Sequence, residues 1–443
     1  MASATTLTPT ATRPALHSIL PPLILGTATF NHQYVSDPHA MPYRDIVARA
    51  LELGVNAFDT SPYYGPSETL LGSALDALMN PAPSESNPTP VPLQRSSFTL
   101  VTKCGRIVMD EFDYSPAYIR YSVLRSLQRL HTPYLDLVYA HDVEFVSPGE
   151  VLAAVRELRR LRDEEGLVRY VGISGFPVDV LCDLAAMVYK ETGEPLDAVL
   201  SYGHFTIQNR KLGLPLLEED RPSRGHVIES DSSPLARFKA AGVDVVLNAS
   251  ILGMGLLTSR GIPADPEPSP DSLPSPLAKW HPSPPELRLA CKKLAAVTAD
   301  AGERLESVAI RWALDEWARV GGAAGLGVTL GSDRVGATVC GVSSIAELEE
   351  TVAEWEGVLS SRPGYQPASA STVSAYGSPH LEKVMGLVQQ GLWPSLGPWK
   401  DFAWESPGPD FVNTRREQDK GIPPNDGVIT AYEELKGWKS RKA

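Results

Sequence analysis

Short apolar runs alternate with amphipathic stretches along this chain, and the alternation constrains its fold more than any other feature. Eight such runs are recognisable: LILGTATF, VNAFDTS, FTLVTK, YLDLVYAH, LVRYVGISG, LDAVLSY, VDVVLNAS and ATVCGVSS. Between them, stretches such as Gly149 to Gly166 carry apolar residues at the helical period and charged residues on the other face. Strands that alternate with helices pair in parallel through crossovers. We therefore expect an α/β fold, a (β/α)8 TIM barrel with long loop insertions and a C-terminal extension.

The expected barrel covers residues 22–360. Its loop insertions are rich in Pro, Ser and charge: Asn80 to Arg95, Leu212 to Pro234, and Gly261 to Leu287. A Gly-rich patch, Val320 to Gly336, lacks the spacing of a phosphate-binding loop and is expected to be an ordinary connector. Residues 361–443 form the extension, with one or more helices, one of them SPHLEKVMGLVQQGLW. The extension either packs across the barrel or extends away from it.

The net charge and the cysteines indicate which binding partners and which cellular compartment to expect. A formal net charge of -13 and a pI near 5.2 argue against a surface for nucleic acid or anionic membrane. No apolar run is long enough to span a membrane. The cysteines are scattered without ligand spacing, so we expect no metal site, no disulfide framework and a cytoplasmic location. Residues 1–21 are expected to form a flexible N-terminal arm, with an import peptide as the alternative.

Polar side chains follow three consecutive expected strands. Asp59 and Tyr64 follow the second strand, Lys103 ends the third and His141 ends the fourth. Because chemistry in such a barrel sits where strands end, these side chains should converge. A nearby ammonium stabilises a phenolate, and a carboxylate keeps that ammonium charged and oriented, so the group would tune Tyr64 for acid–base work. His141 would hold the substrate oxygen by a hydrogen bond.

Each of these residues also has a plainer interpretation. Lys103 alone would be a surface charge, His141 beside Asp142 a satisfied hydrogen-bonding residue, and Asp59 a distant helix cap. All four types at one barrel mouth in consecutive units make coincidence the weaker explanation.

The motifs FDTSPYYG, VTK and YAHD, in this order, resemble the catalytic tetrad of the aldo-keto reductase superfamily, and the resemblance covers roughly residues 20 to 360. It implies a (β/α)8 barrel that binds a nicotinamide cofactor extended across the strand ends, without a Rossmann domain. It also implies that Tyr64 is the acid–base, that Lys103 and Asp59 tune it, and that His141 aligns the reacting oxygen.

The resemblance extends to the cofactor path. Gly26 and Thr27 match the approach to the nicotinamide, and Ser174 matches a carboxamide-binding Ser. The stretch LNASILGMGLLT resembles a pyrophosphate-covering loop, which implies contacts from Ser250, Leu252 and Gly255. The third insertion follows this loop and is expected to border the cofactor.

Three positions depart from the family pattern. Gly175 stands where an Asn often follows the carboxamide Ser, Tyr202 stands in place of a Gln, and Ala249 replaces the aromatic residue that stacks on nicotinamide. Tyr202 is our expected replacement contact, and a core aromatic is the alternative.

The segment CGVSSIAELEETV resembles the motif that holds the adenosine end, which implies contacts from residues of this segment: Gly341, Val342, Ser343, Glu347 and Glu350. NADP-dependent members commonly carry a Lys or Arg and then an Arg at the places of Gly341 and Glu347. A carboxylate repels a 2′-phosphate and accepts a hydrogen bond from a free ribose hydroxyl, so we predict NAD. The alternative is that Glu347 only decorates the first turn of a helix.

The stretches TSPYYG, YAHDVEF and NASILGMGLLT resemble a narrower branch, the NAD-linked D-arabinose and L-galactose dehydrogenases. This implies an aldose as the small-molecule substrate, oxidised at C1 to a lactone, with Tyr64 as the base. Two alternatives stay open. One is an NADPH-dependent reductase of aldehydes or pyridoxal, and the other is a nucleotide-binding barrel with a sensor or docking role.

Overall fold

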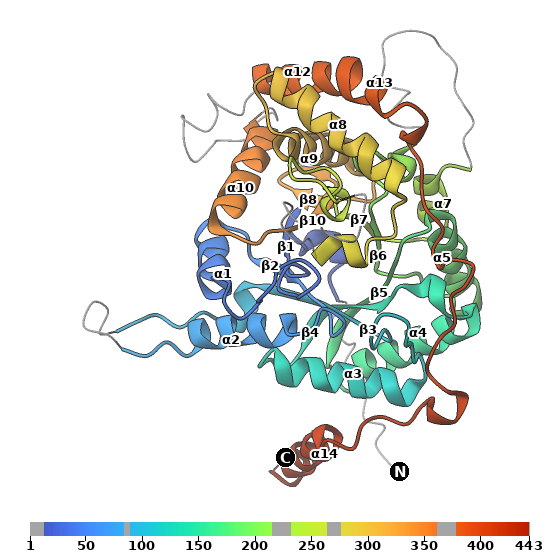
Figure 1. The fold of residues 1–443 in the computed structure, drawn as a ribbon. Helices are drawn as coiled ribbons and strands as arrows, with labels where there is room; N and C mark the ends of the chain where they lie inside the picture. Colours follow the sequence, from blue (N-terminus) through green and yellow to red (C-terminus); the bar gives the residue numbers. More distant parts are fainter. Residues whose placement is uncertain (1–12, 84–88, 215–231, 264–275, 361–377, 443) are drawn as a thin grey trace.

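The computed structural model describes residues 13–83, 89–214, 232–263, 276–360 and 378–442. Within these ranges, parallel strands close into a barrel in the order β1-β10-β7-β6-β5-β4-β3-β2, surrounded by helices (Figure 1). The barrel strands are β1 (Leu23–Gly26), β2 (Ala57–Asp59), β3 (Thr99–Cys104), β4 (Leu135–His141), β5 (Val168–Gly175), β6 (Ala198–Tyr202), β7 (Val245–Ala249) and β10 (Ala337–Gly341). Each barrel strand falls on one predicted apolar run, with β3 extending one residue beyond its run, so the (β/α)8 prediction is confirmed.

Helices surround the barrel, and each except α9 is the first α-helix described after a barrel strand. They are α1 (Tyr43–Glu52), α2 (Ser67–Met79), α3 (Pro116–Arg129), α4 (Pro148–Asp163), α5 (Val178–Thr192), α7 (Pro234–Ala240), α8 (Pro285–Asp300), α9 (Leu305–Ala323) and α10 (Ile345–Ser360). Helix α4 shows how the local sequence sets a boundary. Ser147 and Glu150 form a reciprocal capping box at its start, and Val151 and Val155 are buried. No helix in the described ranges is both long and apolar enough to cross a membrane.

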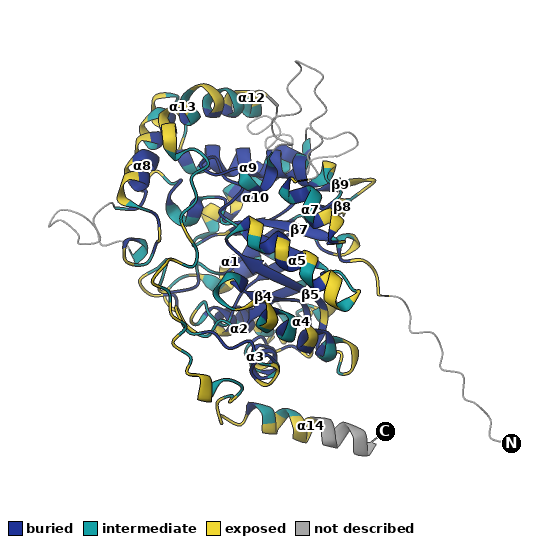
Figure 2. Cartoon of the chain, turned by 90° about the vertical axis from the view of Figure 1, so that its right-hand side faces the viewer, coloured by how far each residue is buried: buried dark blue, intermediate teal, exposed yellow. Residues whose placement is uncertain are grey.

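The barrel strands form the buried centre of the molecule, coloured dark blue in Figure 2. Strand β4 is buried along its whole length, which explains its nearly continuous apolar sequence. The register pairs Gly26 with Asp59 and His141 with Ser174. Strands β2, β3 and β4 are neighbours in the barrel, so their carboxyl ends meet at one rim.

The Gly-rich patch is not an ordinary connector. After the end of α9 it forms an antiparallel hairpin of β8 (Val328–Leu330) and β9 (Asp333–Val335). A Cβ atom at Gly327 would lie 2.1 Å from the Val335 carbonyl oxygen, and one at Gly336 would lie 2.1 Å from that of Trp317. The glycines therefore permit close backbone packing. Composition alone does not distinguish glycines in such a packed hairpin from glycines in a loop.

The described residues near both ends of the chain pack against the barrel. Residues 1–12 lie outside the described residues, but the remainder of the predicted arm packs on the barrel instead of being flexible. Leu16 and Leu20 are buried, and the Arg13 guanidinium lies 4.5 Å from the centroid of the Tyr170 ring.

The C-terminal extension packs across the barrel. Its described part contains α12 (Ser378–Leu387), α13 (Trp393–Leu396) and α14 (Val428–Lys442), while residues 361–377 lie outside the described ranges. Between α13 and α14 the chain runs along the molecule, and α14 packs against α3 (Figure 1). Asp401 accepts hydrogen bonds from the guanidinium and backbone of Arg210, and Tyr121 donates to Asp426 at 2.7 Å. We call residues 399–426 the tail.

Candidate active site

Four polar side chains converge at the rim formed by β2, β3 and β4. Lys103 Nζ donates to Asp59 Oδ1 at 2.5 Å and to the Thr60 carbonyl oxygen at 3.0 Å. The same Nζ lies 5.0 Å from the centroid of the Tyr64 ring. The Tyr64 and His141 rings meet edge-on, with centroids 5.7 Å apart. The structure thus brings together Asp59, Tyr64, Lys103 and His141, and all four line one cavity.

The electrostatic state of Tyr64 differs from the one expected from its sequence neighbours. Burial of the hydroxyl raises the pKa of Tyr64 well above its ordinary value, and the charges of Asp59 and Asp142 raise it further. Lys103 does not reverse this, because its ammonium is paired with Asp59. Tyr64 therefore holds its proton in the free protein.

The Asp59–Lys103 pair is buried on both sides, with both side chains at most 5% exposed. Burial raises the pKa of Asp59, and the neighbouring ammonium opposes that rise. The second carboxylate oxygen, Oδ2, is buried without a partner among the described residues. The pair is thus a desolvated unit that depends on both members.

His141 is a neutral hydrogen-bond donor. Burial lowers the pKa of His141 to about 3, so the imidazole is uncharged at neutral pH. Ser61 Oγ accepts the Tyr63 backbone N–H at 3.1 Å and lies 3.1 Å from His141 Nδ1. When Ser61 donates to Nδ1, the imidazole proton resides on Nε2. This nitrogen is free to donate to an oxygen in the cavity, a consequence of Ser61 that the sequence reasoning missed.

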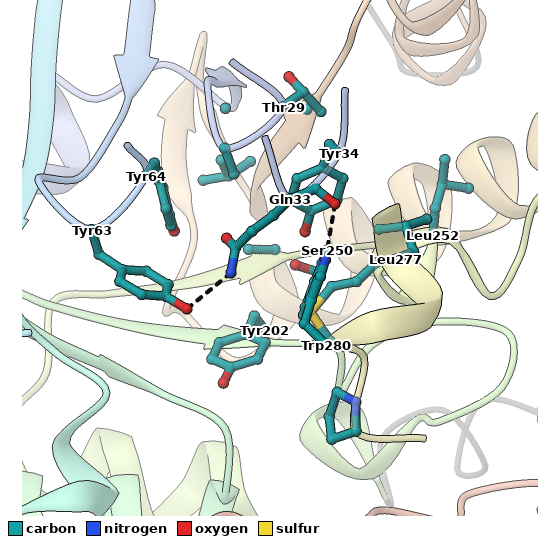
Figure 3. A pocket seen from close by; sticks show the side chains of 18 of the residues that line it. Thr29, Gln33, Tyr34, Tyr63, Tyr64, Tyr202, Ser250, Leu252, Leu277 and Trp280 are labelled. Atoms are coloured by element: carbon teal, nitrogen blue, oxygen red, sulfur yellow. Dashed lines mark hydrogen bonds between the residues drawn. The ribbon is translucent and has the colours of Figure 1, made fainter. Parts of the chain in front are cut away.

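The cavity has a volume of about 590 Å³ and extends from the four rim residues to the start of α10. Figure 3 shows side chains from opposite parts of its wall, including Tyr63, Gln33 and Trp280. Gln33 Nε2 donates to the Tyr63 hydroxyl at 3.0 Å, and Trp280 Nε1 donates to the Gln33 carbonyl oxygen at 2.9 Å (Figure 3). The described end of the third insertion, which carries Trp280, therefore bridges to the loop after β1.

Most of the residues expected along the cofactor path line this cavity. They are Gly26, Ser174, Tyr202, Ser250, Leu252, Gly255, Gly341, Ser343 and Glu347. Ala249 lines it beside Tyr202, its register partner on the neighbouring strand. Position 249 thus carries no aromatic ring, but Tyr202 on the neighbouring strand β6 supplies one beside it.

Three expected contacts do not line the cavity. Thr27 is buried, with its hydroxyl bonded to the Asp59 carbonyl oxygen and to Ser67, so it ties β1 to the start of α2. Val342 is also buried. Glu350 accepts hydrogen bonds from Arg304 and Ser307 and so points toward α9.

Two sequence departures have local causes in the structure. A Cβ atom at Gly175 would lie 2.4 Å from Glu144 Oε2, so the Glu144 carboxylate fills the space that an Asn side chain needs. Glu347 accepts hydrogen bonds from the Ser343 backbone N–H at 2.6 Å and from its hydroxyl at 2.9 Å. Glu347 therefore both decorates the first turn of α10 and carries negative charge at the cavity wall.

Sequence reasoning missed two groups of lining residues. Arg106 and Asp142 line the cavity next to the rim, three residues after Lys103 and directly after His141. The tail supplies Trp404 and Phe411. Trp404 stacks on Phe176 with centroids 4.6 Å apart, and Phe411 meets Phe145 edge-on at 4.8 Å. The proximity of Arg106 and Asp142 to the rim motifs was a usable signal, whereas the tail offered only its aromatic content.

Comparisons with known proteins agree with this geometry. The profile described as "Aldo/keto reductase family" matches residues 22–362. The chain is 38% identical over 341 residues to the D-arabinose 1-dehydrogenase of Saccharomyces cerevisiae, covering 76% of this chain and 84% of that protein. It is 32% identical over 352 residues to the L-galactose dehydrogenase of Arabidopsis thaliana, covering 79% and 86%.

Among solved structures, a glycerol dehydrogenase from Gluconobacter oxydans superposes with a TM-score of 0.51 at 19% identity, covering 90% of this chain and 98% of that one. At this identity the likeness concerns the barrel fold alone.

Proposed function

Because the chain belongs to the aldo/keto reductase family of oxidoreductases, we propose that it oxidises the C1 hydroxyl of an aldose of the D-arabinose or L-galactose type with NAD, giving the aldonolactone. The observation that carries this proposal is the convergence of Tyr64, Lys103 and a neutral, donating His141 on one cavity. The similarity to two sugar dehydrogenases over most of the chain supports the substrate class.

The walls near the rim fit a sugar. Phe145, Trp404 and Phe411 present aromatic rings, while Arg106 and Asp142 supply charged groups within the same part of the cavity. A wall that combines aromatic rings with fixed polar groups is typical of sites that bind small molecules in one orientation. An aldose offers both apolar ring faces and hydroxyls to such a wall.

The residues present also fit a dinucleotide. Gly26 and Gly341 are register partners on β1 and β10, and both line the cavity, where their backbone would lie against a ligand. Ser174 and Tyr202 would contact the nicotinamide end, and the loop that carries Ser250 and Leu252 would cover the pyrophosphate. Arg260, after that loop, would bring a positive charge to the phosphates.

The rim residues account for the proton movement. A bound oxidised nicotinamide would supply the hydride acceptor for the C1 hydrogen. Tyr64 would first release its own proton to solvent and then, as a phenolate favoured by the Lys103 ammonium, take the proton of the C1 hydroxyl. His141 donates from Nε2 to the same oxygen and fixes its position. Asp59 keeps the Lys103 ammonium oriented through the 2.5 Å contact.

The cofactor preference depends on Glu347. We predict that the protein prefers NAD over NADP, and that Glu347→Gln raises the relative use of NADP, measured as the ratio of kcat/KM values, by about tenfold. This equals about 1.4 kcal/mol, a reasonable size for removing one repulsive charge at an exposed position. Gln can still accept the bonds from Ser343, so the start of α10 should stay intact.

Glu350→Gln is the matched control, because Glu350 lies three residues further along α10 but points toward α9. It should leave the cofactor ratio unchanged. A wild-type preference for NADP, or an equal effect of both substitutions, would contradict the assignment of Glu347.

The proposed function is tested with a panel of aldoses and NAD, following nicotinamide absorbance and identifying the product as lactone or not. The raised pKa of Tyr64 favours a second candidate, a reductase of aldehydes or pyridoxal that uses NADPH, because Tyr64 then starts as the proton donor. The same panel therefore includes aldehydes with NADPH. Lactone formation with NAD at a kcat/KM above that of any NADPH reaction is the expected result.

A further inference from the structure

Next to the reacting position, the cavity wall carries a hydrogen-bond donor and an acceptor side by side. His141 Nε2 and Asp142 Oδ2 are 3.4 Å apart, and both residues line the cavity. This separation exceeds the length of a strong hydrogen bond, and a carboxylate has acceptor sites beyond the one that Arg106 Nη1 uses on Oδ2, so each group keeps capacity for a ligand. Asp142 follows β4 in a left-handed conformation with φ of 57°, which places its carboxylate beside the imidazole. A non-glycine residue in this conformation is uncommon and recurs at functional sites.

Arg106 holds the Asp142 carboxylate in place. The guanidinium donates to Asp142 from Nη1, to the Met109 carbonyl oxygen from Nη2 at 2.7 Å, and to that of Val108 from Nε at 3.3 Å. It also lies 3.8 Å from the centroid of the Tyr63 ring. Each nitrogen of Arg106 thus donates one hydrogen bond within the protein, and these bonds fix the guanidinium that supports the Asp142 carboxylate.

The Asp142 carboxylate is charged although it is only 2% exposed. Burial alone would raise the pKa of Asp142, but the Arg106 guanidinium that bonds to it and the Lys103 ammonium oppose that rise. A charged acceptor forms hydrogen bonds roughly twice as strong as a neutral one. A ligand hydroxyl is the complementary group.

We propose that Asp142 is the specificity-determining residue that accepts a hydrogen bond from the hydroxyl on C2 of the substrate, while His141 donates to the oxygen on C1. This rests on the proposed function. The oxygens of two neighbouring hydroxyls lie roughly one hydrogen-bond length apart, which matches the spacing of the His141 and Asp142 groups. The site thus selects substrates that carry a hydroxyl next to the reacting carbon, as an aldose does and a simple alcohol or aldehyde does not.

The test combines a deletion in the substrate with a deletion in the protein. The best aldose of the panel and its 2-deoxy counterpart are compared with wild type and with Asp142→Ala. Wild type should lose about 10- to 100-fold in kcat/KM on the 2-deoxy sugar, the size of one hydrogen bond to a charged group. In Asp142→Ala this ratio should fall to within about threefold of unity. Because the ratio is taken within one variant, partial misfolding does not affect it.

Glu405→Gln is the matched control, since Glu405 is another carboxylate that lines the cavity. It should keep the wild-type ratio between the two sugars. A wild-type protein indifferent to the C2 hydroxyl would overturn the proposal. An Asp142→Ala variant that still discriminates between the aldose and its 2-deoxy counterpart would also overturn it, because Asp142 would then only orient His141. A loss of this discrimination in Glu405→Gln would overturn it as well.

The proposed function can fail separately. If no aldose is oxidised with NAD, that function is wrong, and the same comparison is run in the reductive direction with glyceraldehyde and 3-hydroxypropanal. A preference for glyceraldehyde that disappears in Asp142→Ala would support the role of Asp142 there. If wild type shows no preference for glyceraldehyde, or if Asp142→Ala keeps the preference, the proposed role of Asp142 is wrong.

Discussion

Tyr64→Phe should lower kcat by about 10²–10⁴-fold for any substrate that the protein turns over, the usual contribution of a general acid–base. Phe keeps the ring that meets His141 edge-on but has no proton to give or take. Binding of the dinucleotide, measured by fluorescence titration, should stay within about twofold. The loss should therefore appear in kcat and not in the dissociation constant of the cofactor.

Tyr63→Phe is the matched control. Tyr63 is the neighbouring phenol, lines the same cavity and bonds to Gln33, but Lys103 lies over the ring of Tyr64. Loss of the Tyr63 hydroxyl should lower kcat by less than about tenfold, the scale of one neutral hydrogen bond. Full activity of Tyr64→Phe, or an equal loss in Tyr63→Phe, would show that the acid–base lies elsewhere.

Lys103→Met should destabilise the protein by about 3–5 kcal/mol and also abolish most turnover. The reason is that Asp59 would be left as a buried carboxylate without its ammonium, 4% exposed. The free energy of unfolding is measured by urea titration, and turnover by the steady-state rate of the folded fraction. Activity should fall by about 10²-fold or more, because the charge that favours the Tyr64 phenolate is gone.

The double variant Asp59→Asn, Lys103→Met separates stability from chemistry. It removes both buried charges, so most of the lost free energy of unfolding should return, while activity should not. Recovery of turnover in the double variant would mean that the pair is structural. An unchanged stability in Lys103→Met would mean that Asp59 accepts a proton at little cost.

The sequence predicted the parts of this molecule that local periodicity determines. The barrel strands are short, apolar and separated by helices with one apolar face, and consecutive strands such as β3 and β4 must be neighbours, which placed Lys103 and His141 at one rim. The direction of the Tyr64 pKa was not predictable in the same way, because it depends on burial and on the pairing of Lys103 with Asp59.

Other differences arise from side-chain direction and from distant contacts. Glu350 lies three residues after Glu347, a rotation about 60° short of a full turn, which is enough to turn it toward Ser307 instead of the cavity. Trp404 reaches the cavity by stacking on Phe176, more than two hundred residues earlier in the chain. No local pattern encodes such a contact.

The tail has a consequence for the order in which the site is made. During synthesis, every strand that bears a rim residue emerges from the ribosome long before Trp404 and Phe411, which line the cavity beside Arg106 and Asp142. The part of the cavity wall that the tail contributes is therefore the last to be synthesised. Because none of the four rim residues lies in the tail, substitutions there can reshape this wall and leave those residues unchanged.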